Sequence, residues 1–212
     1  MKDRAPRLFV VSAPSGAGKT SLLKAIVQQD PKLRVSVSHT TRPRRASESD
    51  GVHSHFVDEP TFEAMVAAGE FLEHARVFDN RYGTARGSVE TMLRAGTDVI
   101  LEIDWQGAQQ VRSHWGADNL SSIFILPPSR AALVERLRVR DEDDDAVIER
   151  RTLEAAVEIS HYAEFDHVVV NDDFDTAVAD LQAIVDAVRG GTEVTQPDVS
   201  ELVGRLLGEA FD

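Results

Sequence analysis

The stretch RLFVVSAPSGAGKTSLLKAIVQQ, residues 7–29, decides the fold of this chain. Its first part, RLFVVS (residues 7–12), is an apolar run that predicts a buried strand, and TSLLKAIVQQ (residues 20–29) has apolar residues at helical spacing. Between them, APSGAGKT (residues 13–20) fits the phosphate-binding loop, although Ala13 stands where glycine is usual. The order of strand, glycine-rich loop and helix predicts an α/β protein built on a P-loop.

The residue types in this loop suit a nucleoside triphosphate. Gly16 and Gly18 let the backbone turn tightly, so that N–H groups converge on phosphate oxygens at the start of a helix. Lys19 supplies a positive charge to the β- and γ-phosphates, and the Thr20 hydroxyl is a ligand for Mg²⁺. The alternative is a glycine turn that binds no ligand. The expected contacts to the triphosphate come from Ser15, Gly16, Ala17, Gly18, Lys19, Thr20 and Ser21.

An acidic residue, Asp104, ends the apolar run DVILEID, residues 98–104. A carboxylate at the end of such a strand can hold Mg²⁺ directly or through water, which makes Asp104 a candidate metal ligand. Aspartate is also a good helix cap, and a helix is expected from Trp105 onward. Both interpretations of Asp104 remain open at this point.

The remaining chain alternates between apolar runs and helical patterns. Further strands are expected at residues 121–128 and 167–172, and further helices at residues 129–140, 144–163 and 173–189. Strands separated by helices predict a parallel sheet covered by helices. Residues 36–90 do not follow this alternation of strands and helices and are interpreted as an insertion beside the sheet. Residues 190–198 resemble a linker before a short amphipathic helix.

Composition excludes several classes of protein. The chain has 212 residues with 42% hydrophobic and 28% charged residues, which is the balance of an ordinary globular domain. A net charge of −13 disfavours broad binding to nucleic acid. The chain has no cysteine, which excludes disulfides and thiol catalysis. No apolar run approaches the roughly 20 residues of a membrane span, so we expect no membrane partner and a cytoplasmic protein.

Six segments in order resemble the guanylate kinase family over about residues 7–190: SAPSGAGKTSLL, SVSHTTRPRR, FLEHARVFDNRYGT, VILEIDWQGAQQV, IFILPPS and VVVNDDFDTA. The resemblance implies transfer of the γ-phosphoryl group of ATP, bound with Mg²⁺, to GMP and dGMP in purine nucleotide metabolism. It also implies a core of residues 5–35 and 97–190, a GMP-binding insertion at about 36–90 and a lid at about 136–152. Residues 191–212 would form the linker and C-terminal helix, with self-association left open.

The resemblance assigns recognition of the base to four residues. Guanine presents N1–H and N2–H₂ donors on one edge, and a carboxylate can accept both. Glu73 matches the family residue with this role, although an exposed strand residue is the alternative. Ser38, Thr84 and Glu102 match further base contacts, and Glu102 stands where many relatives have aspartate.

Arginines are expected at the acceptor phosphate. The resemblance assigns this phosphate to Arg42, Arg45 and Tyr82, since a planar guanidinium meets two oxygens at once. The segment TRPRRASE departs from the family pattern, which makes Arg44 a rival to Arg45.

A second departure lies three residues after Gly51. Ser54 stands where the family has a tyrosine on the GMP phosphate, so contact is expected only through water, with His53 or His55 as alternatives. Weaker GMP binding is the expected consequence.

The donor side is expected to include arginines of the lid. The resemblance assigns Arg136, Arg140 and Arg151 to the triphosphate and places Asn171 near the adenine. No general base is required, because a phosphate monoester is already an anionic nucleophile. The rate then depends on how the reacting groups are positioned and how their charge is neutralised. Gly107, in DWQGA, is predicted to permit close packing near the phosphate site. The expected catalytic residues are Lys19, Arg42, Asp104, Arg140 and Arg151.

Two other functions remain open. One is a protein-binding module of the same family without ATP chemistry, which the presence of Lys19, Thr20 and Asp104 disfavours. The other is a P-loop kinase with a different phosphorylated acceptor, which Glu73 and Tyr82 disfavour.

Overall fold

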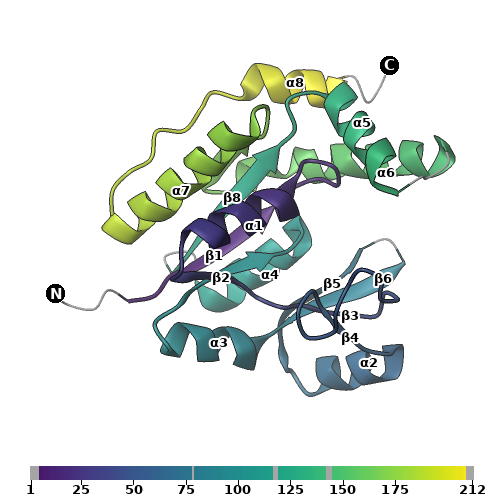
Figure 1. The fold of residues 1–212 in the computed structure, drawn as a ribbon, viewed down its shortest axis with the longest axis vertical. Coiled ribbons are helices and arrows are strands. Elements are labelled where there is room, and N and C mark those ends of the chain that lie inside the picture. The colour runs from purple at the N-terminus through teal and green to yellow at the C-terminus, as the bar shows by residue number, and fades with distance from the viewer. Residues whose placement is uncertain (1–4, 78, 117–118, 142–144, 209–212) are drawn as a thin grey trace. The chain divides into compact units, whose positions relative to one another are not determined.

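The computed structural model describes residues 5–77, 79–116, 119–141 and 145–208 (Figure 1). The chain divides into two compact units. Unit 1 comprises residues 1–10 and 31–120, and unit 2 comprises residues 11–30 and 121–212. The boundary falls within the first strand, between Val10 and Val11, and the loop that follows this strand belongs to unit 2.

Five strands form one hydrogen-bonded sheet in the order β2-β7-β1-β8-β9. Their bounds are Leu8–Ser12 for β1, Leu33–Val35 for β2, Asp98–Glu102 for β7, Leu120–Leu126 for β8 and His167–Val170 for β9. The pairs β2–β7 and β8–β9 are parallel, as predicted from the alternation of strands and helices. Strand β2 was not expected, because three residues with one buried side chain are too short to show a period.

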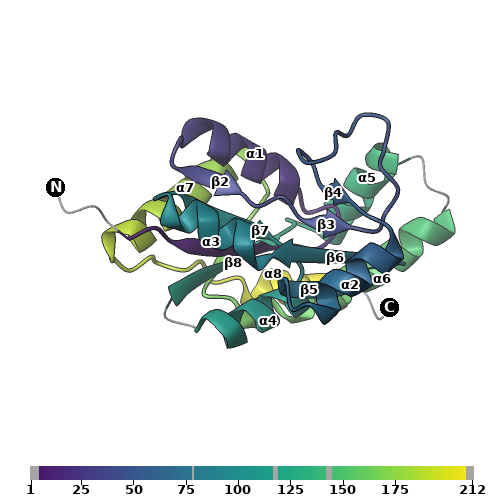
Figure 2. The ribbon, with the colours of Figure 1, turned by 90° about the horizontal axis from the view of Figure 1, so that it is seen from below.

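Unit 1 also contains a four-stranded sheet in the order β4-β3-β6-β5 (Figure 2). These strands are His39–Thr40 (β3), His55–Phe56 (β4), Phe71–Val77 (β5) and Asn80–Ala85 (β6). The helices of the unit are Glu59–Ala67 (α2), Arg86–Arg94 (α3) and Trp105–Trp115 (α4). Phe62 of α2 stacks on Phe71 of β5 with ring centroids 4.6 Å apart, so a buried aromatic pair fixes α2 on this sheet.

Unit 2 contains the helix that follows the P-loop and the helices of the C-terminal half. Their bounds are Lys19–Gln29 (α1), Arg130–Asp141 (α5), Asp145–Ser160 (α6), Phe174–Gly190 (α7) and Ser200–Gly208 (α8), and residues Tyr162–Glu164 form a 3₁₀ turn. Helices α1 and α7 lie side by side (Figures 1 and 2). An ion pair between Arg189 and Asp30 joins the ends of these helices, so α1 is anchored at the end remote from the loop.

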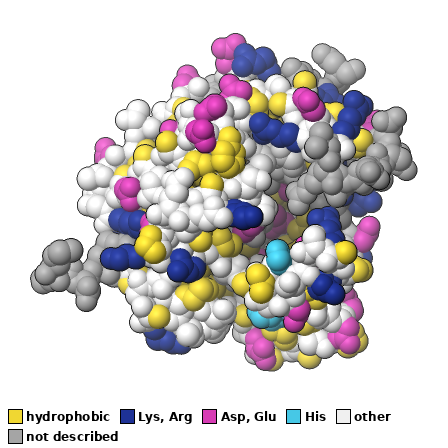
Figure 3. Space-filling model, viewed as in Figure 1, with side chains coloured by type: hydrophobic (Ala, Val, Ile, Leu, Met, Phe, Trp, Pro, Cys, Tyr) yellow, Lys and Arg dark blue, Asp and Glu magenta, His cyan; other side chains and the backbone are white. Residues whose placement is uncertain are grey.

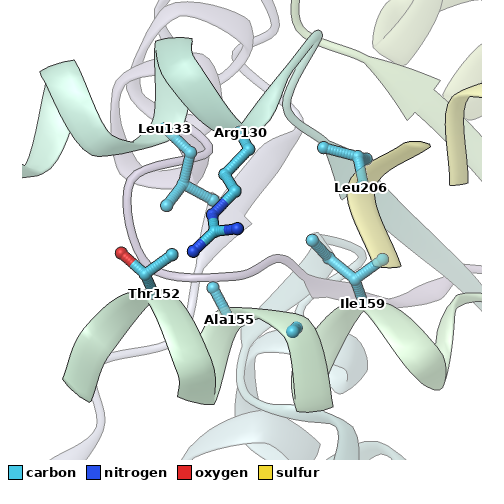
Figure 4. A pocket seen from close by; sticks show the side chains of 7 residues that line it. Arg130, Leu133, Thr152, Ala155, Ile159 and Leu206 are labelled. Atoms are coloured by element: carbon cyan, nitrogen blue, oxygen red, sulfur yellow. The ribbon is translucent and has the colours of Figure 1, made fainter. Parts of the chain in front are cut away.

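Helix α8 packs on the body of unit 2 through its apolar face. Val203 and Leu206 are buried in one cluster with Phe124 of β8. Beside this cluster, a cavity of about 10 Å³ between α5, α6 and α8 is lined by Arg130, Leu206 and five other residues (Figure 4). That volume is close to what one water molecule needs, so the cavity is no nucleotide site.

The surface is charged and of mixed sign. On the face in Figure 3, acidic and basic side chains are interspersed. Within the described ranges, the structure contains no helix with the length and apolar character needed to cross a bilayer.

Candidate active site

Glu73 and Thr84 form a buried polar pair in unit 1. They lie directly opposite each other on β5 and β6, so both side chains point to the same face of the sheet. Only 3% of Glu73 and 1% of Thr84 is exposed, and the Thr84 hydroxyl donates a hydrogen bond to Glu73 Oε1 over 2.6 Å. Glu73 is therefore not an exposed strand residue.

A buried carboxylate needs donors around it, because an unpaired buried charge is costly. The Thr84 hydroxyl is one donor to this carboxylate, and an ionised carboxylate can accept adjacent N–H groups through its two oxygens. The pair has the chemistry of a site that binds adjacent N–H groups.

Arg42, an expected phosphate contact, is held by an acidic residue that was not assigned a role from the sequence. Its guanidinium donates two hydrogen bonds to Glu48, of 3.1 Å to Oε2 and 2.7 Å to Oε1. The backbone N–H of Arg45 donates to the same carboxylate over 2.8 Å. The rival residue Arg44 donates to the Glu48 carbonyl oxygen. Glu48 therefore organises the segment that carries all three arginines.

The Arg42–Glu48 contact also shifts both pKa values. The hydrogen bond from Arg42 lowers the pKa of Glu48 to about 2, and the bond to Glu48 is the main cause that raises the pKa of Arg42. The charge interaction with Tyr82 also contributes to the raised pKa of Arg42. Because the folded-state pKa of Glu48 is the lower one, the pair persists at neutral pH and weakens only as the pH falls toward about 2.

Ser54 and the neighbouring histidines make local contacts. The Ser54 hydroxyl donates to the His53 carbonyl oxygen over 2.8 Å, and His53 Nδ1 accepts the Ser49 N–H over 3.0 Å. The His55 ring stacks on His39 with centroids 4.5 Å apart. Burial, together with the charge of His55, lowers the pKa of His39, which favours a neutral stacked ring.

The P-loop in unit 2 has the backbone geometry that its glycines require. Gly16 and Gly18 adopt φ values of 86° and 91°, in the left-handed region that glycine enters readily. The Ala17 N–H bonds to the Pro14 carbonyl over 3.0 Å and closes the turn. Helix α1 begins after Gly18 with no side-chain cap, as expected where an anion is to lie at the helix N-terminus.

Two residues that are expected near the nucleotide contact the loop. Asn171, of which 4% is exposed, donates from Nδ2 to the Ala17 carbonyl over 2.7 Å. Arg136 donates to that same carbonyl over 3.5 Å and to the Asn171 carbonyl over 3.0 Å. A Cβ atom on Gly18 would collide with Asn171 Nδ2, so this glycine is needed for space as well as for its φ. Asn171 and Arg136 thus brace the loop.

Glu158 of α6 also contacts the loop and was not predicted. Its Oε2 accepts the backbone N–H of Ser15 over 3.1 Å. This carboxylate therefore engages one of the amide groups expected to face the triphosphate. No sequence signal identified the contact, because helical spacing does not tell which distant backbone group a glutamate reaches.

Asp104 caps helix α4. Its Oδ1 accepts the Gly107 N–H over 2.8 Å, and its Oδ2 accepts from the Gln106 side chain over 3.2 Å. The capping interpretation is therefore realised. A carboxylate retains further lone pairs when it caps a helix, so a metal-binding role is compatible with this geometry. Within the described residues, no group of three or more His, Cys, Asp or Glu side chains could hold a metal ion.

The expected site residues fall into two sets, each within one unit. Unit 1 holds Ser38, Arg42, Arg45, Ser54, Glu73, Tyr82, Thr84, Glu102 and Asp104. Unit 2 holds Ser15, Gly16, Ala17, Gly18, Lys19, Thr20, Ser21, Arg136, Arg151 and Asn171. Arg140 also belongs to unit 2, but its side chain lies outside the described part of the chain. The residues expected to bind GMP and those expected to bind the triphosphate can therefore be tested separately, whereas the expected metal ligands Thr20 and Asp104 belong to different units.

Comparisons with known proteins identify the family of this chain. The family model described as guanylate kinase matches residues 5–188. A guanylate kinase of Alkalilimnicola ehrlichii is 57% identical over 201 residues, which cover 95% of this chain and 98% of that protein. A guanylate kinase of Nitrosococcus oceani is 54% identical over 200 residues, with 94% and 98% covered.

A solved structure shares the fold. The crystal structure of guanylate kinase from Anaplasma phagocytophilum matches with a TM-score of 0.69 at 33% identity, and the match covers 96% of each chain. Because the family model, the sequence relatives and this structure each span nearly the whole chain, the chain belongs to the guanylate kinase family.

Proposed function

We propose that this member of the guanylate kinase family, which phosphorylates GMP to GDP with ATP, recognises guanine through Glu73 and grips ATP through the P-loop and Lys19. The buried hydrogen bond between Thr84 and Glu73 is the observation that carries the proposal. The proposal includes dGMP as a second acceptor, a place in purine nucleotide metabolism and action in the cytoplasm.

Glu73 selects guanine by the direction of hydrogen bonds. The guanine edge offers N1–H and N2–H₂ as adjacent donors, which a carboxylate accepts as a charge-assisted pair. Adenine has an acceptor at N1, so the same carboxylate repels it. Thr84 fixes the orientation of Glu73, while Ser38 and Glu102 complete the contacts to the base.

The acceptor phosphate is bound by Arg42, Arg45 and Tyr82. The phosphate competes with Glu48 for the Arg42 guanidinium, which can bind two oxygens in parallel. On the donor side, the loop amides and Lys19 hold the triphosphate, and Arg140 and Arg151 stabilise the charge that develops between the two phosphates. Arg136 and Asn171 hold the loop in shape and lie close to the donor nucleotide.

Thr20 and Asp104 would hold Mg²⁺ together with ATP. A hydroxyl and a carboxylate, completed by phosphate oxygens and water, are the donor types that this ion prefers in kinase sites. The ion supplies neutralisation of phosphate charge, and the protein residues supply the positions of the reacting groups.

An acceptor panel tests this function. GMP, dGMP, AMP, UMP and sugar phosphates are each supplied with ATP and Mg²⁺, and ADP release is measured in a coupled assay. GMP and dGMP are expected to support turnover, and AMP is expected to be rejected by a factor of about 10⁴ in kcat/KM. Equal turnover of AMP, or none with GMP, would refute the assignment of Glu73.

Replacing Ser54 by tyrosine is expected to strengthen GMP binding. The serine hydroxyl bonds to the adjacent His53 carbonyl, whereas a phenol reaches several ångströms farther toward the acceptor phosphate. One hydrogen bond to a charged group contributes about 1.5–3 kcal/mol, so KM for GMP should fall by roughly tenfold or more.

The matched control is Ser54→Phe, which adds the ring without the hydroxyl. It should leave KM for GMP near the wild-type value. An equal decrease of KM in both variants would mean that the ring, and not the hydroxyl, contacts the nucleotide.

A further inference from the structure

Gly107, in the first turn of α4, lies against the carboxylate of Glu73. A Cβ atom at position 107 would stand 2.7 Å from Glu73 Oε2 and 3.2 Å from its Cδ. Contacts shorter than 3.0 Å are essentially never made by a real Cβ atom, so any side chain at this position must displace the Glu73 carboxylate.

Backbone conformation does not explain this glycine. Gly107 is not among the glycines with positive φ, and its N–H bond to Asp104 Oδ1 is one that any residue other than proline can make. Glycine in a helix is less favourable than alanine, so local structure favours alanine here. The Ile103 Cβ atom follows at 3.3 Å, so what glycine provides at position 107 is mainly space for Glu73.

The displaced group has little freedom to move elsewhere. Glu73 is 3% exposed and its Oε1 is bound by the Thr84 hydroxyl. A shift of Oε2 away from position 107 rotates the carboxylate about this bond. Recognition of a base by two parallel hydrogen bonds depends on the orientation of both oxygens, so a small rotation is enough to lose one of them.

We infer that Gly107 is a positioning residue for guanine selectivity, which acts by leaving room for the Glu73 carboxylate in its base-binding orientation. This role rests on the proposed function of Glu73. It differs from the earlier expectation that Gly107 serves packing near the phosphate site, because the nearest atoms to a Cβ at this position belong to Glu73.

The test compares Gly107→Ala with Gly87→Ala. Both glycines lie in helices of unit 1, and a Cβ on Gly87 meets no atom within 4 Å. For Gly107→Ala, KM for GMP should rise by roughly 10- to 100-fold, the loss of one charge-assisted hydrogen bond. KM for ATP should stay at the wild-type value even if the overlap at position 107 lowers Tm. The preference for GMP over IMP, which lacks the 2-amino group, should shrink.

A double-mutant cycle with Glu73→Asp gives an independent readout. The shorter aspartate side chain withdraws from position 107, so Gly107→Ala should raise KM for GMP much less in the Glu73→Asp background than in the wild-type background. Additive effects would show that position 107 does not act through Glu73.

The outcomes separate this inference from the proposed function. If the wild type and Gly87→Ala do not phosphorylate GMP, the proposed function fails. If they do, and Gly107→Ala keeps the wild-type KM for GMP and the wild-type GMP-to-IMP preference, the inference alone is wrong. A fall in Tm with equal increases of both KM values would also overturn it, because that result indicates a structural role only.

Discussion

Replacing Lys19 by alanine is expected to lower kcat for GMP phosphorylation by about 10³-fold, the upper range for removing one group that stabilises charge in a transition state. Lys19 begins α1 directly after Gly18, where the helix start and the loop amides are expected to meet the triphosphate. The positive charge of Lys19 is expected to stabilise the negative charge on the γ-phosphoryl group as this group leaves ATP. Steady-state kinetics with GMP and ATP at saturating Mg²⁺ measure the effect.

The control for this variant is Lys24→Ala on the same helix. Lys24 is exposed, so its removal changes the net charge equally without touching the loop. It should retain wild-type kcat, and both variants should keep the wild-type Tm. If Lys19→Ala keeps more than about a tenth of the wild-type kcat, the loop is not the phosphate site of an active kinase.

Replacing Glu73 by glutamine is expected to raise KM for GMP by about 10²-fold or more. The amide keeps the volume of the side chain but presents an N–H₂ group toward a base edge that also consists of donors. Two charge-assisted hydrogen bonds are weakened or lost, each worth about 1.5–3 kcal/mol. KM for ATP should not change, because the P-loop and Lys19 belong to the other unit.

Glu90→Gln is the matched control for the loss of one negative charge. Glu90 lies on α3 in the same unit and makes a surface ion pair with Arg94 over 3.5 Å. Exposed pairs of this kind contribute about 0–1 kcal/mol, so the control should show wild-type KM values for GMP and ATP. Wild-type GMP kinetics in Glu73→Gln would contradict the assignment of the guanine contact.

Glu48 and Glu158 each contact a group that is expected to bind phosphate. Glu48 binds Arg42, and Glu158 binds the Ser15 N–H, so each carboxylate engages a group that is expected to bind phosphate. A phosphate carries more negative charge than a carboxylate and forms similar hydrogen bonds. We therefore expect a bound phosphate to compete with these carboxylates for the same donor groups.

Local patterns predicted the P-loop and the alternation of strands and helices. A strand, a glycine-rich turn and an amphipathic helix are each specified within a few residues, so residues 7–29 identified the fold directly. Strand β2 was missed because Leu33–Val35 forms a strand only through its pairing with β7. The sequence did not decide whether Asp104 is a metal ligand or a helix cap. Its hydrogen bond from the Gly107 N–H shows that it caps α4.

Motif and family resemblance, read from the sequence alone, determined that this chain carries a P-loop and which acidic residue to expect at guanine. Only the tertiary structure decided that Glu73 is buried against Thr84, that Asn171 and Arg136 brace the loop, and that Gly107 leaves space for a carboxylate. The physical reason is the distance along the chain over which each feature is determined. Turns and helices depend on neighbours along the chain, whereas burial and close contacts depend on residues that only folding brings together.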